Sequence, residues 1–470
     1  MQKIQRKLKK KLSRKFRPAC RKIRVLDLFA GAGGLSLGFD LVRNAAGEKV
    51  FEIIRAVEID PDACQTLRDY FKKEYQRDNV VLQGDLTKKE TRKRIIEECE
   101  DGIDIIVGGP PCQSFSTIGP RSGYGVNDDS YDKNSRDGLY KEYLHLVEQL
   151  KPSFIIFENV KGITSKKDRH DRRYVDVIAA DFMKLGYSFE NESKKVNDEY
   201  LLLNAADYGV PQMRERVFLI GNRLGIKNPY PLKTHFNPSL KIAPFWTTLR
   251  DAIGDLPELK AKYTMTDVRG KEKKKIAELN QKIYSGAEAI PFHKERFDKH
   301  LKSISEKGKA LLRFLRAGAN GTLAYHLCRS QKKDDIKLFS GMLQGETAKN
   351  LYERKSLRAK QLRKLVKYTT KLKKGEYTFP DKYRKQHWDK PSTTIFSHLE
   401  KDGNRFIHPD SRQARTFTVR EAARIQTFPD WYEFRGSRGS KFRQIGNAVP
   451  PLLARIIAAA IYSKLRTDLI

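Results

Sequence analysis

Short runs of Val, Ile, Leu and Phe recur along the first half of the chain and alternate with segments of helical periodicity. Several runs are almost continuously apolar, as is typical of strands buried on both faces of a sheet. The predicted strands are 23–29, 51–58, 80–84, 103–107, 154–157, 200–203 and 217–220, and segments such as 144–150 and 174–185 predict crossover helices between them. The pattern therefore predicts a doubly wound α/β fold around a mostly parallel sheet.

The pattern changes after the last of these strands. Residues 222–403 are rich in Lys, Arg and Gly and only weakly periodic, which predicts an inserted second domain. Residues 404–470 return to regular patterning and close with the apolar helix Leu452–Ile461, which we expect to pack against the first sheet. Ahead of the sheet domain, 23–221, residues 1–22 carry eleven basic side chains and no acidic one, which predicts a basic arm.

The net charge points to the kind of partner. A formal charge of +35 and a pI near 9.8 indicate a polyanion, although charge alone does not separate DNA, RNA and anionic membranes. Within the insert, Arg354–Lys374 holds ten basic residues and a partial apolar stripe, and a solvated helix face and a phosphate-contacting helix both fit this pattern. The basic arm resembles a transit peptide as well, but we favour an arm attracted to nucleic acid.

The cysteine content and the hydropathy exclude several classes of protein. Five cysteines without a C-x-x-C pair argue against a disulfide framework and an all-cysteine zinc site, and favour reduced thiols in the cytoplasm. The histidines lack metal-ligand spacing, so no metal site is predicted. No apolar run approaches the roughly 20 residues that cross a bilayer, so no membrane segment is predicted.

Three successive predicted strands end in residues suited to a nucleoside. Val25–Phe29 runs into the glycine-rich turn Ala30–Gly34, where backbone amides can approach a ligand closely. The next strand ends in Glu58, placed as an acceptor for ribose hydroxyls, and the third is followed by Asp85. Together these strand ends predict an adenosine pocket, and the absence of a G-x-x-x-x-G-K-[ST] motif disfavours a triphosphate.

The fourth predicted strand presents a thiol beside this pocket. It leads into Gly108–Ser116, where two prolines stiffen the turn that carries Cys112; structural cysteines sit inside apolar runs and not on such a loop. The fifth strand ends in Glu158, which places a carboxyl near the thiol. Arg214 and Arg216 precede the last strand of the sheet and add cationic donors. A pair of surface charges is the other interpretation of these two arginines.

Six sequence blocks carry a specific resemblance. They are DLFAGAGG, GGPPCQSFS, ENV, QMRERVFLIG, REAARIQTFP and RQIGNAVPP. Their identity and order resemble the cytosine-5 DNA methyltransferase family, in its bacterial or phage modification branch. The matched blocks span 23–221 and about 405–454, with a short flank at 390–395.

The resemblance implies a role for Cys112 and for each of the predicted residues around its thiol. The Cys112 thiolate would attack carbon 6 of a cytosine that has flipped out of the duplex, with Glu158 stabilising the protonated ring nitrogen 3. Arg216 would contact the exocyclic oxygen of the base, supported by Arg214. Carbon 5 would then accept the methyl group.

The resemblance also implies S-adenosylmethionine as the cofactor. Phe29 would stack on the adenine, Glu58 would bind the ribose, Asp85 would accept from the adenine amino group, and Asn447 would lie near the methionine moiety. The remaining expected cofactor contacts are Ala30, Gly31, Gly33, Gly34, Leu86 and Pro110.

The implied architecture is a Rossmann-like methyltransferase domain with a smaller inserted domain that recognises DNA. Residues 23–221 would form the catalytic domain, 222–403 the target-recognition domain, and 404–470 a return that packs on the catalytic domain. The implied partner is double-stranded DNA, bound by a cytoplasmic monomer, with a cognate restriction endonuclease as a possible companion. The loop 116–137 is longer than the loop that closes over the flipped base in the family. This difference is expected to affect how the loop closes.

Three other functions compete with this one. An amino-methyltransferase carries Asp, Asn or Ser before Pro-Pro, whereas here glycine precedes the prolines and Cys112 follows them. The transfer-RNA branch of the family is more compact, and the long insert fits a DNA-reading domain better. A catalytically dead DNA-binding regulator typically loses a residue such as Cys112, Glu158 or Arg216, and all three are present.

Overall fold

The computed structural model of the chain describes residues 21–77, 79–111, 139–168, 170–191, 202–265, 270–282, 286–319, 321–367, 369 and 377–469. These residues form two compact units. The first unit contains the described residues up to Tyr208, Arg214–Thr234 and those from Ala448 onward, and the second contains Gly209–Met213 and His235–Asn447.

A seven-stranded sheet forms the centre of the first unit, in the order β3-β2-β1-β4-β5-β8-β6. Its strands are β1 (Ile23–Leu28), β2 (Phe51–Glu58), β3 (Val81–Gln83), β4 (Ile105–Gly108), β5 (Phe154–Val160), β6 (Leu202–Asn204) and β8 (Glu215–Asn222). The strands from β3 to β5 in that order run parallel, while β8 pairs antiparallel with both β5 and β6. The predicted mostly parallel α/β sheet is therefore confirmed.

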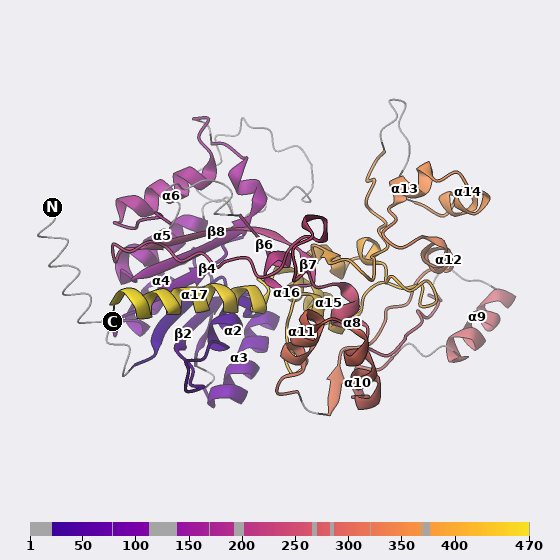
Figure 1. Cartoon of the computed structure of the whole chain (residues 1–470), viewed down its shortest axis with the longest axis horizontal. Helices are drawn as coiled ribbons and strands as arrows, with labels where there is room; N and C mark the ends of the chain where they lie inside the picture. The colour runs from indigo at the N-terminus through magenta and orange to yellow at the C-terminus, as the bar shows by residue number, and fades with distance from the viewer. Residues whose placement is uncertain are drawn as a thin grey trace, which may run out of the picture. The chain divides into compact units, whose positions relative to one another are not determined.

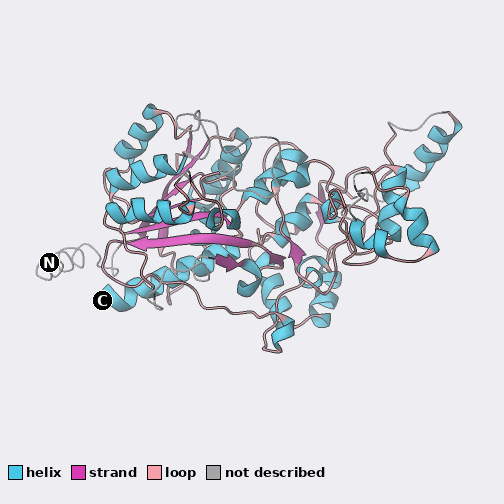
Figure 2. Ribbon diagram, turned by 90° about the horizontal axis from the view of Figure 1, so that it is seen from above, coloured by secondary structure: helices cyan, strands magenta, loops and turns pink. Residues whose placement is uncertain are grey.

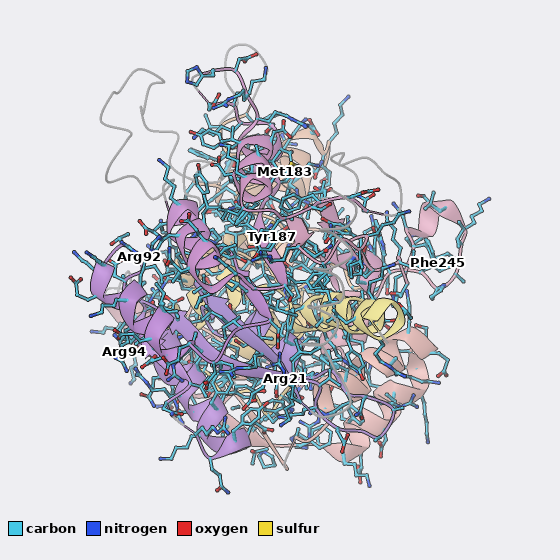
Figure 3. The ribbon with its side chains drawn as sticks, turned by 90° about the vertical axis from the view of Figure 1, so that its left-hand side faces the viewer. Arg21, Arg92, Arg94, Met183, Tyr187 and Phe245 are labelled. Carbon is cyan, nitrogen blue, oxygen red and sulfur yellow. The ribbon has the colours of Figure 1, made fainter. Side chains whose placement is uncertain are left out.

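Helices cover both faces of this sheet (Figures 1 and 2). One face carries α4 (Lys89–Glu98), α5 (Leu139–Leu150) and α6 (Tyr174–Lys184), which bury a core that includes Tyr143, Phe157 and Phe182. The other face carries α2 (Gly34–Asp40), α3 (Pro61–Tyr75) and α17 (Pro451–Leu469). Arg92 and Arg94 lie along α4 (Figure 3).

Two glycines allow α2 and α17 to pack closely, as the adjoining ribbons show in Figure 1. A Cβ atom at Gly34 would lie 2.1 Å from the carbonyl oxygen of Val449, and one at Gly38 would lie 2.3 Å from the Cβ of Ala454. Any larger residue would push the helices apart. In the structure, α17 thus packs directly on α2, one of the helices that cover this face of the sheet.

One helical stretch, Arg438–Thr467, is long and apolar enough to cross a membrane by length and composition. In the structure, 61% of its most apolar window is buried inside the protein, as in a core helix of a globular domain.

Helices make up most of the regular secondary structure described in the second unit. Its helices are α8 (Leu249–Ile253), α9 (Lys271–Lys282), α10 (Lys294–Ser303), α11 (Glu306–Arg316), α12 (Lys333–Gly341), α13 (Ala348–Glu353), α14 (Leu357–Arg363), α15 (Val419–Ile425) and α16 (Arg438–Asn447). Two small sheets accompany them, β9 (Ala289–Pro291) with β10 (Thr322–Ala324), and β7 (Gln212–Met213) with β11 (Ser392–Thr393).

The structure divides the chain at other points than the predicted segments. Residues 404–447 are part of the second unit, and only the residues from Ala448 onward return to the first. Residues 222–234 remain with the sheet, because Asn222 donates from its side chain to Ile226 and Asn228. The assignment of catalysis and DNA recognition to separate segments stays a prediction.

Candidate active site

The carboxyl ends of four parallel strands meet at one edge of the sheet. Leu28 at the end of β1 pairs with Val57 on one side and with Gly108 on the other, and Gly108 pairs with Phe157. The residues that follow these positions therefore emerge next to one another. This register brings the glycine turn, Glu58, the Pro-Pro turn and Glu158 to the same edge.

The glycine turn after β1 depends on left-handed backbone conformations. Phe29, Gly31 and Gly33 have φ angles of 58°, 55° and 75°. A Cβ at Gly31 would meet no atom within 4 Å, so the backbone of the turn faces open space there. Phe29 is half-buried against the core of the sheet, and Ala30 is buried. The turn therefore exposes backbone at the predicted cofactor position.

Glu58 holds the glycine turn against the end of β2. Its Oε2 accepts a hydrogen bond from the backbone N–H of Gly31 at 2.8 Å. Its Oε1 accepts from the N–H groups of Ile59 and Asp60 at 2.9 and 2.8 Å. Three backbone donors thus fix the carboxylate that the sequence assigns to the ribose.

Asp85 and Leu86 follow β3 at the same edge. The Oδ1 of Asp85 accepts from the backbone N–H and the hydroxyl of Thr87 at 2.9 and 2.8 Å. These bonds hold the pKa of Asp85 below its usual value, so the group is an anion that can accept a hydrogen bond from a ligand. Leu86 is buried and packs in the core of the sheet.

Asp27, inside β1, anchors the start of α2. Its Oδ2 accepts from the hydroxyl and the backbone N–H of Ser36 at 2.6 and 3.1 Å. The side chain is fully buried, and burial raises the pKa of Asp27 to about 7. A carboxyl buried under the glycine turn therefore orients the helix that begins at Gly34.

Glu158 lies close to the turn that leads to the predicted nucleophile. A Cβ at Gly109 would lie 2.5 Å from the Oε2 of Glu158, so glycine lets the carboxyl occupy this position without shifting. The side-chain amide of Asn159 donates to the carbonyl oxygen of Pro110 at 3.3 Å. The end of β5 therefore supports the Pro-Pro turn through one hydrogen bond and leaves room for the carboxyl of Glu158.

Arg216 pairs with Glu158, with 3.2 Å between its Nε and the Oε1 of the carboxyl. Both side chains are largely buried, with 14% and 13% of their surface exposed. Burial raises the pKa of Glu158, while the charges of Arg216 and Arg214 oppose that shift. Arg214 is almost completely buried. Contrary to the prediction, Arg216 does not precede the last strand but lies within β8.

Two predicted residues are not part of this described arrangement. Cys112 lies outside the described residues, since the described chain stops at Pro111. Asn447 is the exposed last residue of α16 in the second unit.

Besides Asp27, the structure draws attention to two residues that the sequence patterns left without a role. Asn159 was visible only as a neighbour of Glu158, and its contact with Pro110 depends on the pairing of β4 with β5. Ile59 follows Glu58 and is 61% exposed. The sequence offers one signal for Ile59: it is an apolar residue just beyond the end of a strand, next to the predicted ribose acceptor Glu58.

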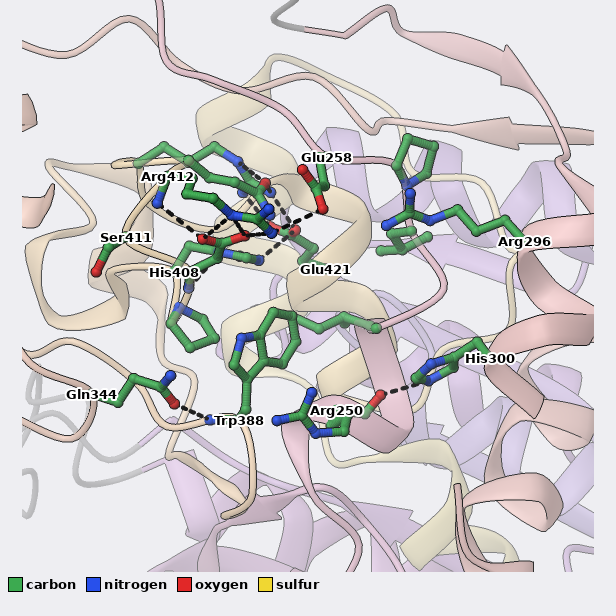
Figure 4. Close-up of a pocket in the computed structure, with 18 of the residues that line it drawn as sticks. Arg250, Glu258, Arg296, His300, Gln344, Trp388, His408, Ser411, Arg412 and Glu421 are labelled. Carbon is green, nitrogen blue, oxygen red and sulfur yellow. Dashed lines mark hydrogen bonds and ion pairs between the residues drawn. The ribbon is translucent and has the colours of Figure 1, made fainter. Parts of the chain in front are cut away.

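The second unit has its own pocket, of about 480 Å³, shown in Figure 4. Its charged side chains largely satisfy one another: Arg412 pairs with Glu258 and Asp410 at 3.0 and 2.8 Å, and Nε2 of His300 bonds the carbonyl oxygen of Arg250 at 2.9 Å. The pocket brings together none of the predicted chemical residues. The edge of the sheet is therefore the better candidate for the active site.

Comparisons with known proteins identify the family of the chain. The family model described as C-5 cytosine-specific DNA methylase matches residues 23–463. The Type II methyltransferase M.XorII of Xanthomonas oryzae pv. oryzae is 34% identical over 94% of this chain and 85% of its own length. M.AgeI of Thalassovita gelatinovora is 32% identical over 93% of this chain and 99% of its own length.

Among solved structures, one from E. coli is described as a prophage-encoded DNA modification methyltransferase. It has a TM-score of 0.55 and 25% sequence identity, covering 95% of this chain and all of that one.

Proposed function

Since the chain belongs to the C-5 cytosine-specific DNA methylase family, and so transfers a methyl group to cytosine in DNA, we propose that Cys112 is its covalent nucleophile and S-adenosylmethionine its methyl donor. The observation that carries this proposal is the Pro-Pro turn, which Asn159 supports beside a buried glutamate. Cys112 is the next residue along the chain.

The edge of the sheet fits the proposed cofactor. The open backbone at Gly31 lets a ligand approach the turn, and the exposed Ile59 offers an apolar surface beside it. Glu58 is already fixed by three backbone donors, and the Oδ2 of Asp85 is not used by the two bonds from Thr87. These residues would hold the nucleoside. When bound, S-adenosylmethionine supplies an electrophilic sulfonium methyl group.

The residues of the chain activate the cytosine, whose carbon 5 is a poor nucleophile. The Cys112 thiolate forms a bond to carbon 6, and ring nitrogen 3 gains a proton stabilised by Glu158. Electron density then rises at carbon 5, which accepts the methyl group. Carbon 5 then loses its proton to water, the thiolate is expelled, and the proton on nitrogen 3 returns to Glu158, which restores the aromatic ring. The raised pKa of Glu158 suits it to share a proton with nitrogen 3.

The two arginines orient the base. Arg216 already contacts Glu158, so its guanidinium is close enough to hold the exocyclic oxygen of a base that Glu158 engages. The buried Arg214 supports it. A paired cytosine hides both reacting carbons, so the base must leave the duplex at a cost of a few kcal/mol, which contacts with the DNA offset.

The relatives named Type II methyltransferases favour a modification enzyme over the transfer-RNA branch and over a dead regulator. We place it in the cytoplasm as a monomer that protects sites from a cognate restriction endonuclease.

The test is covalent trapping on DNA that contains 5-fluorocytosine. Fluorine blocks the final loss from carbon 5, so the wild-type protein with S-adenosylmethionine should form a stable adduct. Cys112→Ser should form none, because a hydroxyl is far less acidic than a thiol. Cys20→Ser, the matched control, should trap like the wild type. A normal adduct yield from Cys112→Ser would exclude this cysteine as the nucleophile.

A further inference from the structure

The basic segment that begins at Arg354 contains two kinds of basic residue. Arg354 pairs with the buried Glu346, with 3.3 Å between Nε and Oε1. Arg363 turns inward, where its Nε donates to the carbonyl oxygen of Leu351 at 3.0 Å and its Nη2 to that of Arg354. These two arginines hold the segment together and are not available to a ligand.

Helix α14 is fixed firmly beneath these contacts. It follows α13 after a link of three residues, and the hydroxyl of Ser356 accepts from the N–H of Ala359 at 3.2 Å. Ala359 and Leu362 are buried, at 0% and 3% exposure. A Cβ at Gly341 of α12 would lie 2.6 Å from Leu362, so the two helices touch. One face of α14 is thereby committed to the core.

The opposite face of α14 is left to solvent. Leu357 is 76% exposed, and Arg358, Lys360, Gln361 and Lys364 are exposed as well. Within the part of the chain that the structure describes, these four polar side chains form no hydrogen bond or ion pair. The sequence from Arg354 to Lys367 holds no acidic residue. The face is therefore positive and has unused donors.

Helical spacing orders these side chains into a stripe with two flanks. Leu357, Gln361 and Lys364 follow one another at intervals of four and three residues, which places them in one line along the helix. At about 100° per residue, Arg358 falls on one side of that line and Lys360 on the other. An exposed leucine and a neutral amide thus occupy the middle line, with Lys364 at its C-terminal end, between the cations Arg358 and Lys360.

We propose that α14 enters the major groove of the DNA substrate, with Leu357 and Gln361 reading base edges and Arg358 and Lys360 contacting the phosphates on either side. A helix with its side chains is about 10–12 Å across, and the groove is about 12 Å wide. Glutamine suits the donor and acceptor pair of adenine, and an apolar side chain suits the methyl group of thymine. The inference rests on the proposed function for its substrate and adds the residues that select the site.

This arrangement explains why a leucine is exposed beside unpaired cations. A purely solvated face gains nothing from Leu357, whereas a DNA-reading face can use an apolar side chain and an amide at its centre, since contacts to phosphates alone carry no base information.

The first experiment compares methylation patterns of the wild type and Gln361→Ala on DNA of high sequence diversity, by sequencing the methylated product. Loss of one base contact should relax the preference at one position of the recognition sequence by about tenfold or more, while the methyl group stays on carbon 5. Leu357→Ala should relax a neighbouring position. Both side chains are exposed, so the fold should tolerate the changes. An unchanged recognition sequence in both variants would overturn the proposal.

The second experiment measures duplex binding of Arg358→Gln/Lys360→Gln at several salt concentrations. The slope of log affinity against log salt should flatten by about 0.9 for each lost phosphate contact, with the recognition sequence unchanged. Lys273→Gln/Lys274→Gln on α9 is the matched control, because both lysines are exposed in the same unit. An equal change in slope in the control would mean that only net charge matters, against the proposal.

Trapping on fluorocytosine DNA separates this inference from the proposed function. Gln361→Ala should still form the adduct at a high DNA concentration. If the wild type forms no adduct, the proposed covalent mechanism is wrong. If the wild type forms the adduct but the α14 variants keep its recognition sequence, only the proposed role of α14 is wrong.

Discussion

The two units use buried charge differently. Among the described residues at the edge of the sheet in the first unit, Glu158 pairs with Arg216 at 3.2 Å, and burial raises the pKa of Glu158. In the second unit, Arg424 contacts Asp255 at 2.5 Å and Asp430 at 2.7 Å, with all three side chains buried. A carboxyl with one weak ion pair, such as Glu158, can exchange a proton. The carboxylates that Arg424 binds closely cannot do so. The first arrangement suits chemistry, and the second fixes a fold.

The sequence blocks that identify the family differ in the same way: some place buried charge in the fold, and others place it at the candidate active site. Arg420, Glu421 and Arg424 belong to the block REAARIQTFP and are at most 1% exposed. Glu421 forms two hydrogen bonds of 2.7 Å with Arg415. A recognisable block of charged residues is therefore structural here, although its sequence points to function as strongly as the block around Glu158.

The sharpest test of the contrast is Glu158→Gln. We expect the methylation rate to fall by about 10²–10⁴-fold, since the amide cannot exchange a proton with the base. The amide still offers an acceptor to Arg216, so the unfolding free energy should change little. Single-turnover kinetics and denaturant unfolding measure the two quantities. A variant that keeps more than a tenth of the rate would contradict the role given to this carboxyl.

Arg424→Met should show the reverse behaviour. Removing the guanidinium leaves Asp255 and Asp430 buried with fewer partners, which should cost roughly 3–5 kcal/mol of unfolding free energy. Arg412→Met is the matched control: its side chain is 70% exposed, and its loss should lower the unfolding free energy far less. If urea titrations showed the same loss of unfolding free energy for both variants, the buried network around Arg424 would not be what stabilises the second unit.

The units should also respond oppositely to acid. Burial lowers the pKa of His326 to about 4 and that of His408 to about 3, so the unfolded chain binds protons first as the pH falls below about 6.5. The second unit should lose roughly 2 kcal/mol per histidine between pH 7 and 5. Asp27, with its pKa raised to about 7, binds a proton first in the folded state and so gains stability over the same range.

Tryptophan fluorescence can follow the second unit alone, because Trp246, Trp388 and Trp431 all lie in it. Its urea midpoint should fall between pH 7 and 5, and His408→Gln should reduce that fall. A midpoint independent of pH would show that the histidines are protonated in the folded state.

The smallest expected effect concerns Glu58. Glu58→Ala should weaken S-adenosylmethionine binding by about 1–3 kcal/mol, as one charge-assisted acceptor and the support of the glycine turn are lost. Glu52→Ala, on the same strand, removes only a partly exposed pair with Arg77 and should leave binding unchanged. Calorimetry that found equal affinities for both variants would remove Glu58 from the cofactor site.

Local patterns were enough to predict the sheet, because its strands are apolar runs whose ends carry Glu58 and Asp85. They could not show that Gly109 makes room for Glu158, since that depends on two strands pairing in register. Nor could they show that Arg424 meets Asp255, far away in the sequence. The sequence of Arg354–Lys374 suggests one basic helix, whereas the described part of this segment is helical only over Leu357–Arg363.

The close packing of α17 on α2 has a consequence for the order in which the protein is made. The ribosome completes all strands of the large sheet, and then the whole second unit, before it reaches Pro451–Leu469. Until that helix emerges, the side of α2 that carries Gly34 and Gly38 has no cover. A nascent chain that stops after Asn447 therefore contains the entire second unit but not a finished sheet unit. The close packing on α2 can therefore form only after Pro451–Leu469 has left the ribosome.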